Sequence, residues 1–246
     1  MRIWSVVSQK GGSGKTTLLL HVSIAAMAKG LAVSIFDLDP QRSAEQWAEL
    51  RETLLKTEEP TVVHGAPMGL DGMIDAARDT DTDLVLIDTP PAVTKAIAEV
   101  VSFADLVILP TRPSPHDLRA VGPTIDICDA HKKQMIFALN AATPRARITM
   151  EAAVALSQHG TVAPVTIYNR TDFAASMIDG RTVMEIEPDG KSAEEVRQLW
   201  EYIDQRLMRM GASHDEASDS VVRAAPLFRN KNGLGRDVPA FGRRAN

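Results

Sequence analysis

The sequence has one cysteine, no long apolar run and no secretory signal, and each absence excludes a class of protein. A single Cys128 cannot form an internal disulfide or a cysteine-based metal site, which favours a reducing cytoplasm. No apolar run approaches the ~20 residues that a membrane-crossing helix needs. The N-terminus leads directly into an apolar run of strand type instead of a signal peptide. We therefore expect neither a disulfide scaffold nor a membrane span.

The charge balance has no large excess of either sign. Lys and Arg number 27 against 32 Asp and Glu, which gives a net charge of −5. This balance argues against coating of nucleic acid over the whole surface but leaves room for a local basic patch. A hydrophobic content of 44% and 246 residues allow one large α/β domain, or two small ones, with a sizeable core.

Apolar runs and helical patterns alternate along the chain, as a parallel sheet with crossover helices requires. Several runs are nearly continuous Val, Ile and Leu, which is typical of strands covered on both faces. We therefore expect an α/β fold with a doubly wound, mainly parallel sheet of the P-loop type. The expected strands are Ile3–Ser8, Ala32–Phe36, Thr61–His64, Leu84–Asp88, Leu106–Pro110, Met135–Asn140 and Val162–Tyr168. The expected helices are Lys15–Lys29, Arg42–Lys56, Gly69–Arg78, Lys95–Phe103, Ser114–Ala130, Thr149–His159 and Ser192–Met210.

The composition changes after Met210. The last expected helix starts with a capping-box pattern, Ser192 followed three residues later by Glu195. Beyond Met210 a small, polar and acidic stretch leads into a basic one that Gly and Pro interrupt too often for a stable helix. We expect a folded domain at residues 1–210 and a flexible basic tail at residues 211–246. The alternative is an end of the chain without a role.

The stretch KGGSGKTT follows the first expected strand and opens the first expected helix. Its glycines let the backbone N–H groups face phosphate oxygens, and the helix N-terminus favours the anion. In this context Lys15 reaches the β- and γ-phosphates and the Thr16 hydroxyl binds Mg²⁺. The predicted phosphate-binding residues are Lys10, Gly11, Gly12, Ser13, Gly14, Lys15, Thr16 and Thr17.

This loop departs from the standard pattern G-x-x-x-x-G-K-[ST] in one place, because Gln9 stands where the first glycine belongs and an extra Lys10 follows. The stretch resembles the deviant Walker A motif, K-G-G-x-G-K-T, of the ParA/MinD group of P-loop ATPases. The resemblance implies ATP and Mg²⁺ as cofactors, a homodimer, and a catalytic Lys10 that reaches across the dimer interface to the partner's ATP. The alternative is that Lys10 adds charge only within its own subunit.

Two carboxylates follow the second expected strand in the stretch FDLDPQRS. Asp37 and Asp39 are two residues apart, so they point the same way from an extended segment at the sheet edge where ligands bind. The resemblance to the ParA-type pattern D-x-D-P-Q implies that Asp39 helps to activate the attacking water, with Asp37 near Mg²⁺ and Gln41 near the phosphates. Taken alone, an Asp-Pro sequence at a strand end is equally typical of a solvated turn.

A third carboxylate, Asp88, ends the apolar run of the fourth expected strand, DLVLIDTPP. It can hold the water shell of Mg²⁺, although a plain strand end is the alternative. The resemblance adds Thr89 and Pro90 as sensors of the γ-phosphate and Asn140 as an adenine contact. An asparagine after a strand is also a common turn residue.

Proteins of the ParA type bind DNA without sequence preference, through Lys and Arg at phosphates. The sequence has no basic motif interleaved with aromatic residues, which agrees with non-specific contacts. Taken singly, each basic candidate is as typical of a plain solvated surface as of a DNA contact. The candidate DNA-binding residues are Arg145, Arg147, Arg170, Arg181, Lys191 and Arg197.

The resemblance implies a cytoplasmic, nucleoid-associated ATPase with weak intrinsic turnover that partitions or positions a cargo and is stimulated by a ParB-like adaptor. Because the phosphate loop starts near residue 10, no N-terminal helix-turn-helix and no site-specific operator binding are expected. The alternatives are a MinD-like ATPase on a membrane surface and a nucleotide-switched scaffold with little turnover. The end of the chain lacks the unbroken amphipathic pattern that membrane docking needs, so a membrane partner is not expected. An ATP-dependent synthetase is not strictly excluded, and the cargo is not identified.

Overall fold

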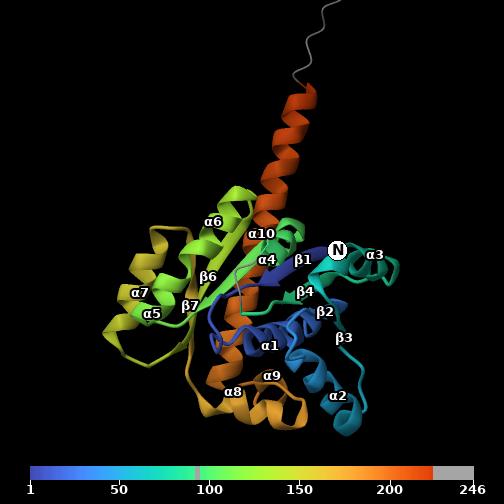
Figure 1. Cartoon of the computed structure of the whole chain (residues 1–246), viewed down its shortest axis with the longest axis vertical. Coiled ribbons are helices and arrows are strands. Elements are labelled where there is room, and N and C mark those ends of the chain that lie inside the picture. Colours follow the sequence, from blue (N-terminus) through green and yellow to red (C-terminus); the bar gives the residue numbers. More distant parts are fainter. Residues whose placement is uncertain (92–94, 224–246) are drawn as a thin grey trace, which may run out of the picture. The chain divides into compact units, whose positions relative to one another are not determined.

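A sheet of seven parallel strands forms the centre of the protein (Figure 1). The computed structural model describes residues 1–91 and 95–223, and its strands adjoin in the order β3-β2-β4-β1-β5-β6-β7. This arrangement confirms the expected doubly wound parallel sheet. The strands are β1 (Arg2–Val6), β2 (Val33–Asp37), β3 (Thr61–His64), β4 (Leu84–Asp88), β5 (Leu106–Thr111), β6 (Gln134–Ala142) and β7 (Thr161–Tyr168).

The helices of the described residues alternate with these strands. They are α1 (Lys15–Met27), α2 (Ser43–Leu55), α3 (Leu70–Asp79), α4 (Lys95–Phe103), α5 (Pro115–Ala120), α6 (Gly122–Ala130), α7 (Arg147–Ser157), α8 (Thr171–Ser176), α9 (Val183–Ile186) and α10 (Lys191–Arg223). Two single 3₁₀ turns, η1 (Pro67–Gly69) and η2 (Met177–Asp179), precede α3 and follow α8.

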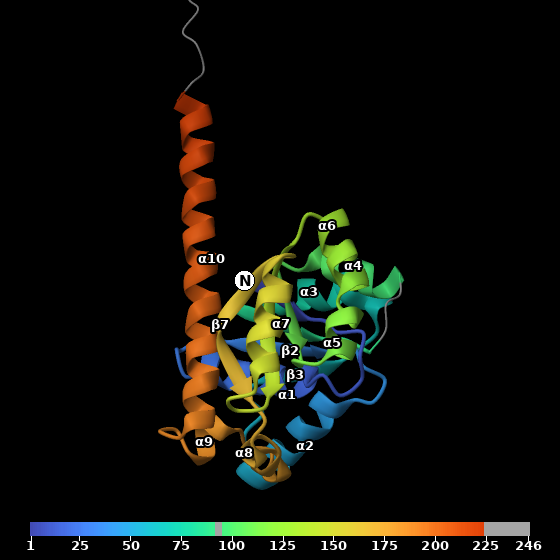
Figure 2. The same cartoon turned by 90° about the vertical axis from the view of Figure 1, so that its left-hand side faces the viewer.

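Helices cover both faces of the sheet (Figures 1 and 2). On one face, buried residues of α3, α4, α6 and α7, such as Ile74 and Leu156, pack on the strands. On the other face, the ring of Trp4 in β1 lies 5.0 Å from the ring of Trp200 in α10, centroid to centroid. Because apolar side chains leave the sheet on both sides, its strands have the continuous apolar runs seen in the sequence.

Cys128 belongs to the core between α6 and the sheet. Its side chain is fully buried among apolar residues such as Val107 and Phe137. Burial, and to a lesser extent the nearby Asp129, raises the pKa of its thiol to about 12. The thiol therefore stays protonated and serves as a small apolar packing group.

The expected helix Ser114–Ala130 is two helices in the structure. Ser114 caps the first, since its hydroxyl accepts from the Asp117 amide at 3.2 Å. The break after Ala120 follows from Pro123, which has no N–H and therefore starts a new helix at α6 instead of continuing α5.

The expected capping box at the start of the last helix is wrong. Helix α10 begins at Lys191, and the Ser192 hydroxyl donates to Asp172 at 2.9 Å. Glu195 accepts from the Tyr168 amide at 3.1 Å, so this carboxylate fastens α10 to β7. A capping box is present at α9 instead, between Thr182 and Glu185.

The expected tail from residue 211 overlaps the last helix, and its flexibility stays a prediction. Helix α10 continues through residues 211–223, a stretch that contains no proline and several good helix formers. Residues 224–246, with most of the tail's basic residues, lie outside the described residues.

The chain divides into two units, Met1–Gln205 and Arg206–Asn246. The first unit contains the sheet and its covering helices. The second unit, in its described part, is the C-terminal portion of α10. Among the described helices, none combines the length and the apolar character needed to cross a membrane.

Candidate nucleotide site

The carboxyl ends of β1, β2 and β4 meet at one edge of the sheet. The strand register places Val6 beside Asp88, and Asp88 beside Asp37. The loop after β1 and the acidic segment after β2 therefore start at neighbouring positions. In an open α/β sheet this edge is where ligands bind.

The loop before α1 depends on its glycines. Gly12 and Gly14 have φ angles of 74° and 87°, which favour glycine. A Cβ at Gly14 would lie 2.4 Å from Asn140 Nδ2, and that amide donates to the Ser13 carbonyl at 2.7 Å. Asn140, near the end of β6, thus fixes the back of the loop and requires a residue without a side chain at Gly14.

Lys15 begins α1 and is buried, with an exposed fraction of 6%. Burial lowers the pKa of its ammonium, and the negative charges of Asp88 and Asp39 partly oppose this effect. A buried cation at a helix N-terminus is a strong attractor for an anion, because two positive potentials add there.

Thr16 and Asp88 are hydrogen-bonded directly, since the threonine hydroxyl donates to Asp88 Oδ2 at 2.5 Å. The Asp88 carboxyl is fully buried, and its Oδ1 has no partner. Burial raises the pKa of Asp88 to about 7, against the lowering effect of the Thr16 hydrogen bond. A hydroxyl and a carboxylate are thus held together as an oxygen-rich pair, of the kind that Mg²⁺ accepts.

Asp37 serves the backbone in this structure. Its Oδ2 accepts from the amides of Ala44 and Glu45 at 2.9 and 3.1 Å, at the start of α2. Its Oδ1 accepts from the Asp39 amide at 3.1 Å. Asp37 therefore lies beside Asp88, but both of its carboxylate oxygens are hydrogen-bonded to backbone amides of the segment from Asp39 to the start of α2.

Asp39 and Gln41 lie on that turn. Asp39 is half-buried, and its Oδ1 accepts from the Gln41 amide at 2.9 Å. Gln41 is exposed. The charge of Asp39 acts on Lys15 of the phosphate loop, where it opposes the lowering of the pKa of that ammonium by burial.

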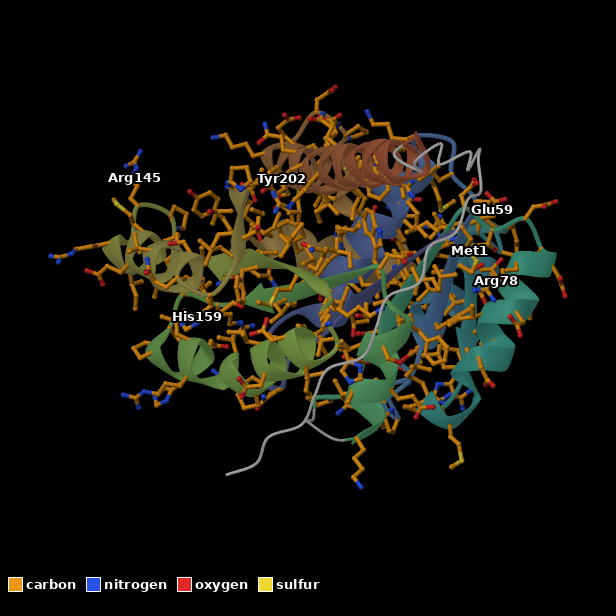
Figure 3. The ribbon with its side chains drawn as sticks, turned by 90° about the horizontal axis from the view of Figure 1, so that it is seen from above. Met1, Glu59, Arg78, Arg145, His159 and Tyr202 are labelled. Carbon is orange, nitrogen blue, oxygen red and sulfur yellow. The ribbon has the colours of Figure 1, made fainter. Side chains whose placement is uncertain are left out.

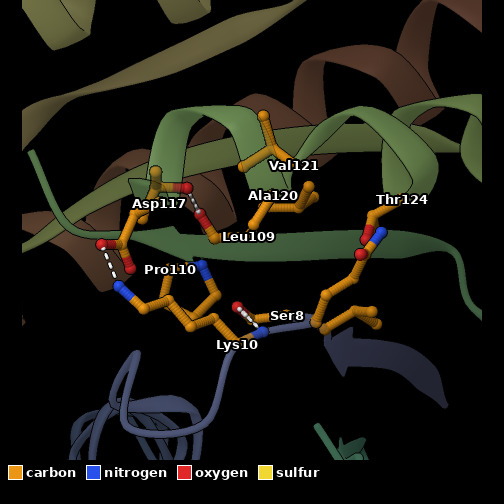
Figure 4. A pocket seen from close by; sticks show the side chains of 11 residues that line it. Ser8, Lys10, Leu109, Pro110, Asp117, Ala120, Val121 and Thr124 are labelled. Atoms are coloured by element: carbon orange, nitrogen blue, oxygen red, sulfur yellow. Dashed lines mark hydrogen bonds and ion pairs between the residues drawn. The ribbon is translucent and has the colours of Figure 1, made fainter. Parts of the chain in front are cut away.

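Lys10 is held by α5 (Figure 4). Its ammonium lies 2.6 Å from Asp117 Oδ2, and the side chains are 43% and 4% exposed, respectively. The Ser114 hydroxyl donates to the same oxygen, while Asp117 Oδ1 is buried without a partner. In a single chain the extra lysine therefore neutralises a nearly buried carboxylate.

A cavity of about 220 Å³ lies next to the loop at the ends of β6 and β7. Of the lining residues that the sequence did not single out, Arg112 carries a charge; it is exposed and has no ion pair among the described residues. A single arginine between two prolines has no spacing that marks it as functional, so only the fold identifies it. The cavity lining is Gly14, Thr17, Leu18, Arg112, Asn140, Ala141, Ile167, Tyr168, Asn169, Arg170, Phe173 and Ala174.

The residues predicted to contact DNA differ in how free they are. Four of them form ion pairs: Arg147 with Glu151, Arg170 with Glu195, Arg181 with Asp179 and Arg197 with Glu194. Arg145 and Lys191 are exposed and have no ion pair within residues 1–91 and 95–223. Arg145 points away from the body of the protein (Figure 3).

Part of this set is brought together by the sheet. The Asn169 amide donates to the Ala142 carbonyl at 2.8 Å, so the segments that carry Arg145 and Arg170 leave the sheet side by side. Arg181 lies instead beside α2, where the Trp47 indole donates to its carbonyl at 3.4 Å.

The residues at this edge fit a nucleoside triphosphate with Mg²⁺. Two buried oxygens, Ser13 Oγ and Asp88 Oδ1, are without partners, and the buried Lys15 lies at the N-terminus of α1. No group of three or more His, Cys, Asp or Glu residues in the described part of the chain could hold a metal by itself. Mg²⁺ is usually held through nucleotide phosphates and water with one or two protein oxygens, and Thr16 and Asp88 offer such oxygens.

Comparison with known proteins supports the same interpretation. The family model described as the CobQ/CobB/MinD/ParA nucleotide-binding domain matches residues 4–183, well over half of the chain. A maintenance of carboxysome distribution protein A from Halothiobacillus neapolitanus is 25% identical over 79% of this chain and 93% of its own length. The protein of the same name from Gloeobacter kilaueensis is 37% identical, but this match spans only 50% of the chain and 55% of that relative.

Solved structures show the same fold. The cell division ATPase MinD of Pyrococcus furiosus superposes with a TM-score of 0.66 at 22% identity, covering 83% of this chain and 98% of its own. MinD of Pyrococcus horikoshii, in complex with Mg-ADP, gives 0.68 at 20% identity, with 84% and 97% covered.

Proposed function

Because the chain belongs to the CobQ/CobB/MinD/ParA nucleotide-binding family, and is therefore an ATPase that uses ATP with Mg²⁺, we propose that it positions a cargo through an ATP-dependent dimer. Its relatives include carboxysome-distribution and chromosome-partitioning ATPases, which supports a positioning role. The finer assignment is a homodimer that binds DNA non-specifically in the ATP state and is released when a ParB-like adaptor stimulates hydrolysis. It would act in the cytoplasm, in association with the nucleoid.

The observation that carries this proposal is the pair of lysines on one loop. Lys15 is buried at the head of α1, where a bound phosphate would lie, whereas Lys10 is on the protein surface and paired with Asp117. Asp117 of α5 thus holds the Lys10 ammonium at the surface, away from the buried Lys15. A cation in this place can serve the nucleotide of a facing subunit.

In the proposed site, each residue has one task. Lys15 and the amides of Gly11 to Gly14 hold the phosphates, and Thr16 and Asp88 hold Mg²⁺, directly or through water, with Asp37 supporting the turn beside them. Asp39 orients the attacking water, and Asn140, Thr17 and Arg112 border the base. Mg²⁺ supplies charge neutralisation of the transferred phosphoryl group when it is bound.

The proposed DNA surface lies at the sheet edge where the segments after β6 and β7 leave the sheet. These segments carry Arg145, Arg147 and Arg170. Arg145 and Lys191 offer free cations, and the exposed pair of Arg147 with Glu151 can open toward phosphates at a small cost, since exposed pairs contribute only about 0–1 kcal/mol. Arg170 is held more firmly, because its partner Glu195 is mostly buried. The set contains no base-reading motif, so we expect affinity for duplexes of any sequence.

The test is binding to a random-sequence duplex with ATP, ADP or no nucleotide, with the oligomeric state followed by sedimentation. We expect a dimer that binds DNA with ATP only, and Lys10→Ala should bind ATP but remain monomeric and off DNA. Lys29→Ala is the matched control, since Lys29 is an exposed lysine that pairs with Glu201. A Lys10→Ala protein that dimerises normally would contradict the trans role of Lys10. A dimer that ignores DNA and binds anionic liposomes would favour a MinD-like role.

A further inference from the structure

His21 is a buried polar residue that the nucleotide site does not use. It lies on α1, one turn after Thr17, and its side chain is fully buried. Because residues four apart share one face of a helix, His21 and Thr17 point in the same direction. That direction is toward α8, the helix that forms one wall of the cavity of about 220 Å³ next to the phosphate loop.

Three contacts fix the imidazole ring. Its Nδ1 lies 2.8 Å from the Thr17 carbonyl, and its Nε2 lies 3.4 Å from Ser176 Oγ. Its ring meets that of Phe173 edge to face, with centroids 5.0 Å apart at 64°. Since a carbonyl can only accept, Nδ1 carries the proton, and Nε2 is left as an acceptor that shares the Ser176 hydroxyl with the Phe173 carbonyl, 3.1 Å from that hydroxyl.

The ring is neutral at ordinary pH. Burial lowers the pKa of His21 to about 4, although the hydrogen bond to the Thr17 carbonyl works in the opposite direction. The contact with α8 is thus made by an uncharged ring, whose packing depends on shape and on the edge-to-face geometry with Phe173.

Both ends of this contact belong to the nucleotide site. Thr17 ends the phosphate-loop motif and lines the cavity of about 220 Å³, and Phe173 lines the same cavity from α8. Asn140 ties the loop to β6, but the described contacts give no comparable polar link from the loop helix to α8 apart from His21. The width of the cavity between Thr17 and Phe173 therefore depends on the histidine ring behind them.

We propose that His21 is a positioning residue that sets the distance between the phosphate loop and the wall of the base pocket, and thereby the affinity for the nucleoside part of ATP. It touches neither phosphate nor base. Its effect passes through Phe173, so it should matter for ligands that carry a base and not for a bare polyphosphate.

The test is His21→Asn, which keeps a donor for the Thr17 carbonyl but withdraws the ring from Phe173. We expect the KM for ATP to rise about tenfold with kcat changed less than twofold, while Mg²⁺-tripolyphosphate competes for the site as well as it does in the unaltered protein. Ser23→Ala is the matched control, because Ser23 is also fully buried on α1 but donates only to Leu20 within the helix, at 2.7 Å. It should change neither the KM nor tripolyphosphate binding.

The inference rests on the proposed nucleotide site, and the two ligands separate the failures. An unaltered protein that binds neither ATP nor tripolyphosphate would overturn the site and the inference together. A His21→Asn protein with an unchanged KM, or with equal losses for ATP and tripolyphosphate, would overturn the inference alone. If His21→Asn does not fold, Ser176→Ala replaces it, because it removes the partner of His21 Nε2 without changing the cavity lining, and it must show the same selective loss of ATP.

Discussion

At the scale of single residues, the site contains ionisable groups whose charged forms are disfavoured by burial. Burial lowers the pKa of Lys15 and raises the pKa of Asp88, so it favours the neutral form of each. Lys10 and Asp117 form an ion pair, in which the carboxylate is nearly buried and the ammonium is half-exposed. If Lys10 moves away, the nearly buried Asp117 carboxylate loses its compensating charge, which costs free energy. The pair therefore opposes the release of Lys10 toward another nucleotide.

The Lys10–Asp117 pair predicts the outcome of Asp117→Asn. The change removes the charge that holds Lys10 on α5, so Lys10 should be freer to serve a partner's nucleotide. Taking the pair as about 1 kcal/mol, ATP should drive dimerisation at a concentration about fivefold lower. Sedimentation across an ATP titration measures this shift.

The control for that experiment is Ser114→Ala. It removes the helix cap and a hydrogen bond to Asp117 but keeps the carboxylate charge. It should lower stability by about 1 kcal/mol and leave the ATP midpoint near that of the unaltered protein. A requirement for more ATP in Asp117→Asn would instead show that Asp117 presents Lys10 to its partner.

His21 predicts a loss of stability in mild acid. Its folded pKa of about 4 lies below the unfolded value of 6.5, so the unfolded chain binds more protons between these values. Its contribution is complete above pH 6.5 and is lost as the pH falls toward 4. From pH 7 to pH 5 the free energy of unfolding should fall by about 2 kcal/mol more in the unaltered protein than in His21→Asn. Urea unfolding of both proteins at the two pH values measures this difference, and equal losses would contradict it.

At the scale of helices and strands, side-chain contacts tie together elements that are distant in sequence. Arg51 of α2 is buried and donates to the Gly180 carbonyl at 2.8 Å and to the Glu59 carbonyl at 2.9 Å. It also pairs with Glu185 at the start of α9, at 2.8 Å. Helix α2 is thereby tied to the segment that follows α8.

Gly180→Ala should break this tie. Gly180 has a φ of 78°, and a Cβ there would lie 2.7 Å from the Arg51 backbone nitrogen, which cannot rotate away. We expect a loss of about 2–3 kcal/mol in the free energy of unfolding by urea. Gly72→Ala is the control, since Gly72 lies in α3 with nothing within 4 Å of its Cβ position, and it should be neutral or slightly stabilising. An unchanged free energy of unfolding in Gly180→Ala would contradict this prediction, because it would mean that the backbone around Gly180 moves to accept the Cβ at little cost.

Most of the strands and the phosphate loop could be predicted from the sequence, because local patterns determine them. The runs Thr61–His64 and Leu84–Asp88 are strands with the expected boundaries, and Lys15 starts α1 as the motif requires. Predictions failed where contacts distant in sequence decide the outcome. Glu195 bonds to Tyr168 in place of a helix cap, and Arg112 becomes a cavity residue only when β5 and β6 lie side by side.

At the scale of the whole molecule, the net charge of −5 requires that any affinity for DNA be local. The edge that carries Arg145, Arg147 and Arg170 is the local surface we propose. Its contribution should be electrostatic and therefore steeply dependent on salt.

Arg145→Ala should weaken DNA binding about equally for all duplex sequences and reduce the slope of log K against log salt by about 1. Titrations of a fluorescent duplex at several salt concentrations, with ATP present, measure the slope. Arg78→Ala is the control, as Arg78 is an exposed arginine of α3 that pairs with Asp75. An unchanged slope in Arg145→Ala would remove this residue from the DNA surface.

The burial of Cys128 has a practical consequence for watching the proposed cycle in real time. A protonated thiol sealed in the core does not react with maleimides, so the native cysteine need not be removed before labelling. A cysteine introduced at the exposed position of His116, one residue before Asp117, would carry a fluorophore beside the partner of Lys10. A change in its emission when ATP is added would report the release of that lysine within one experiment.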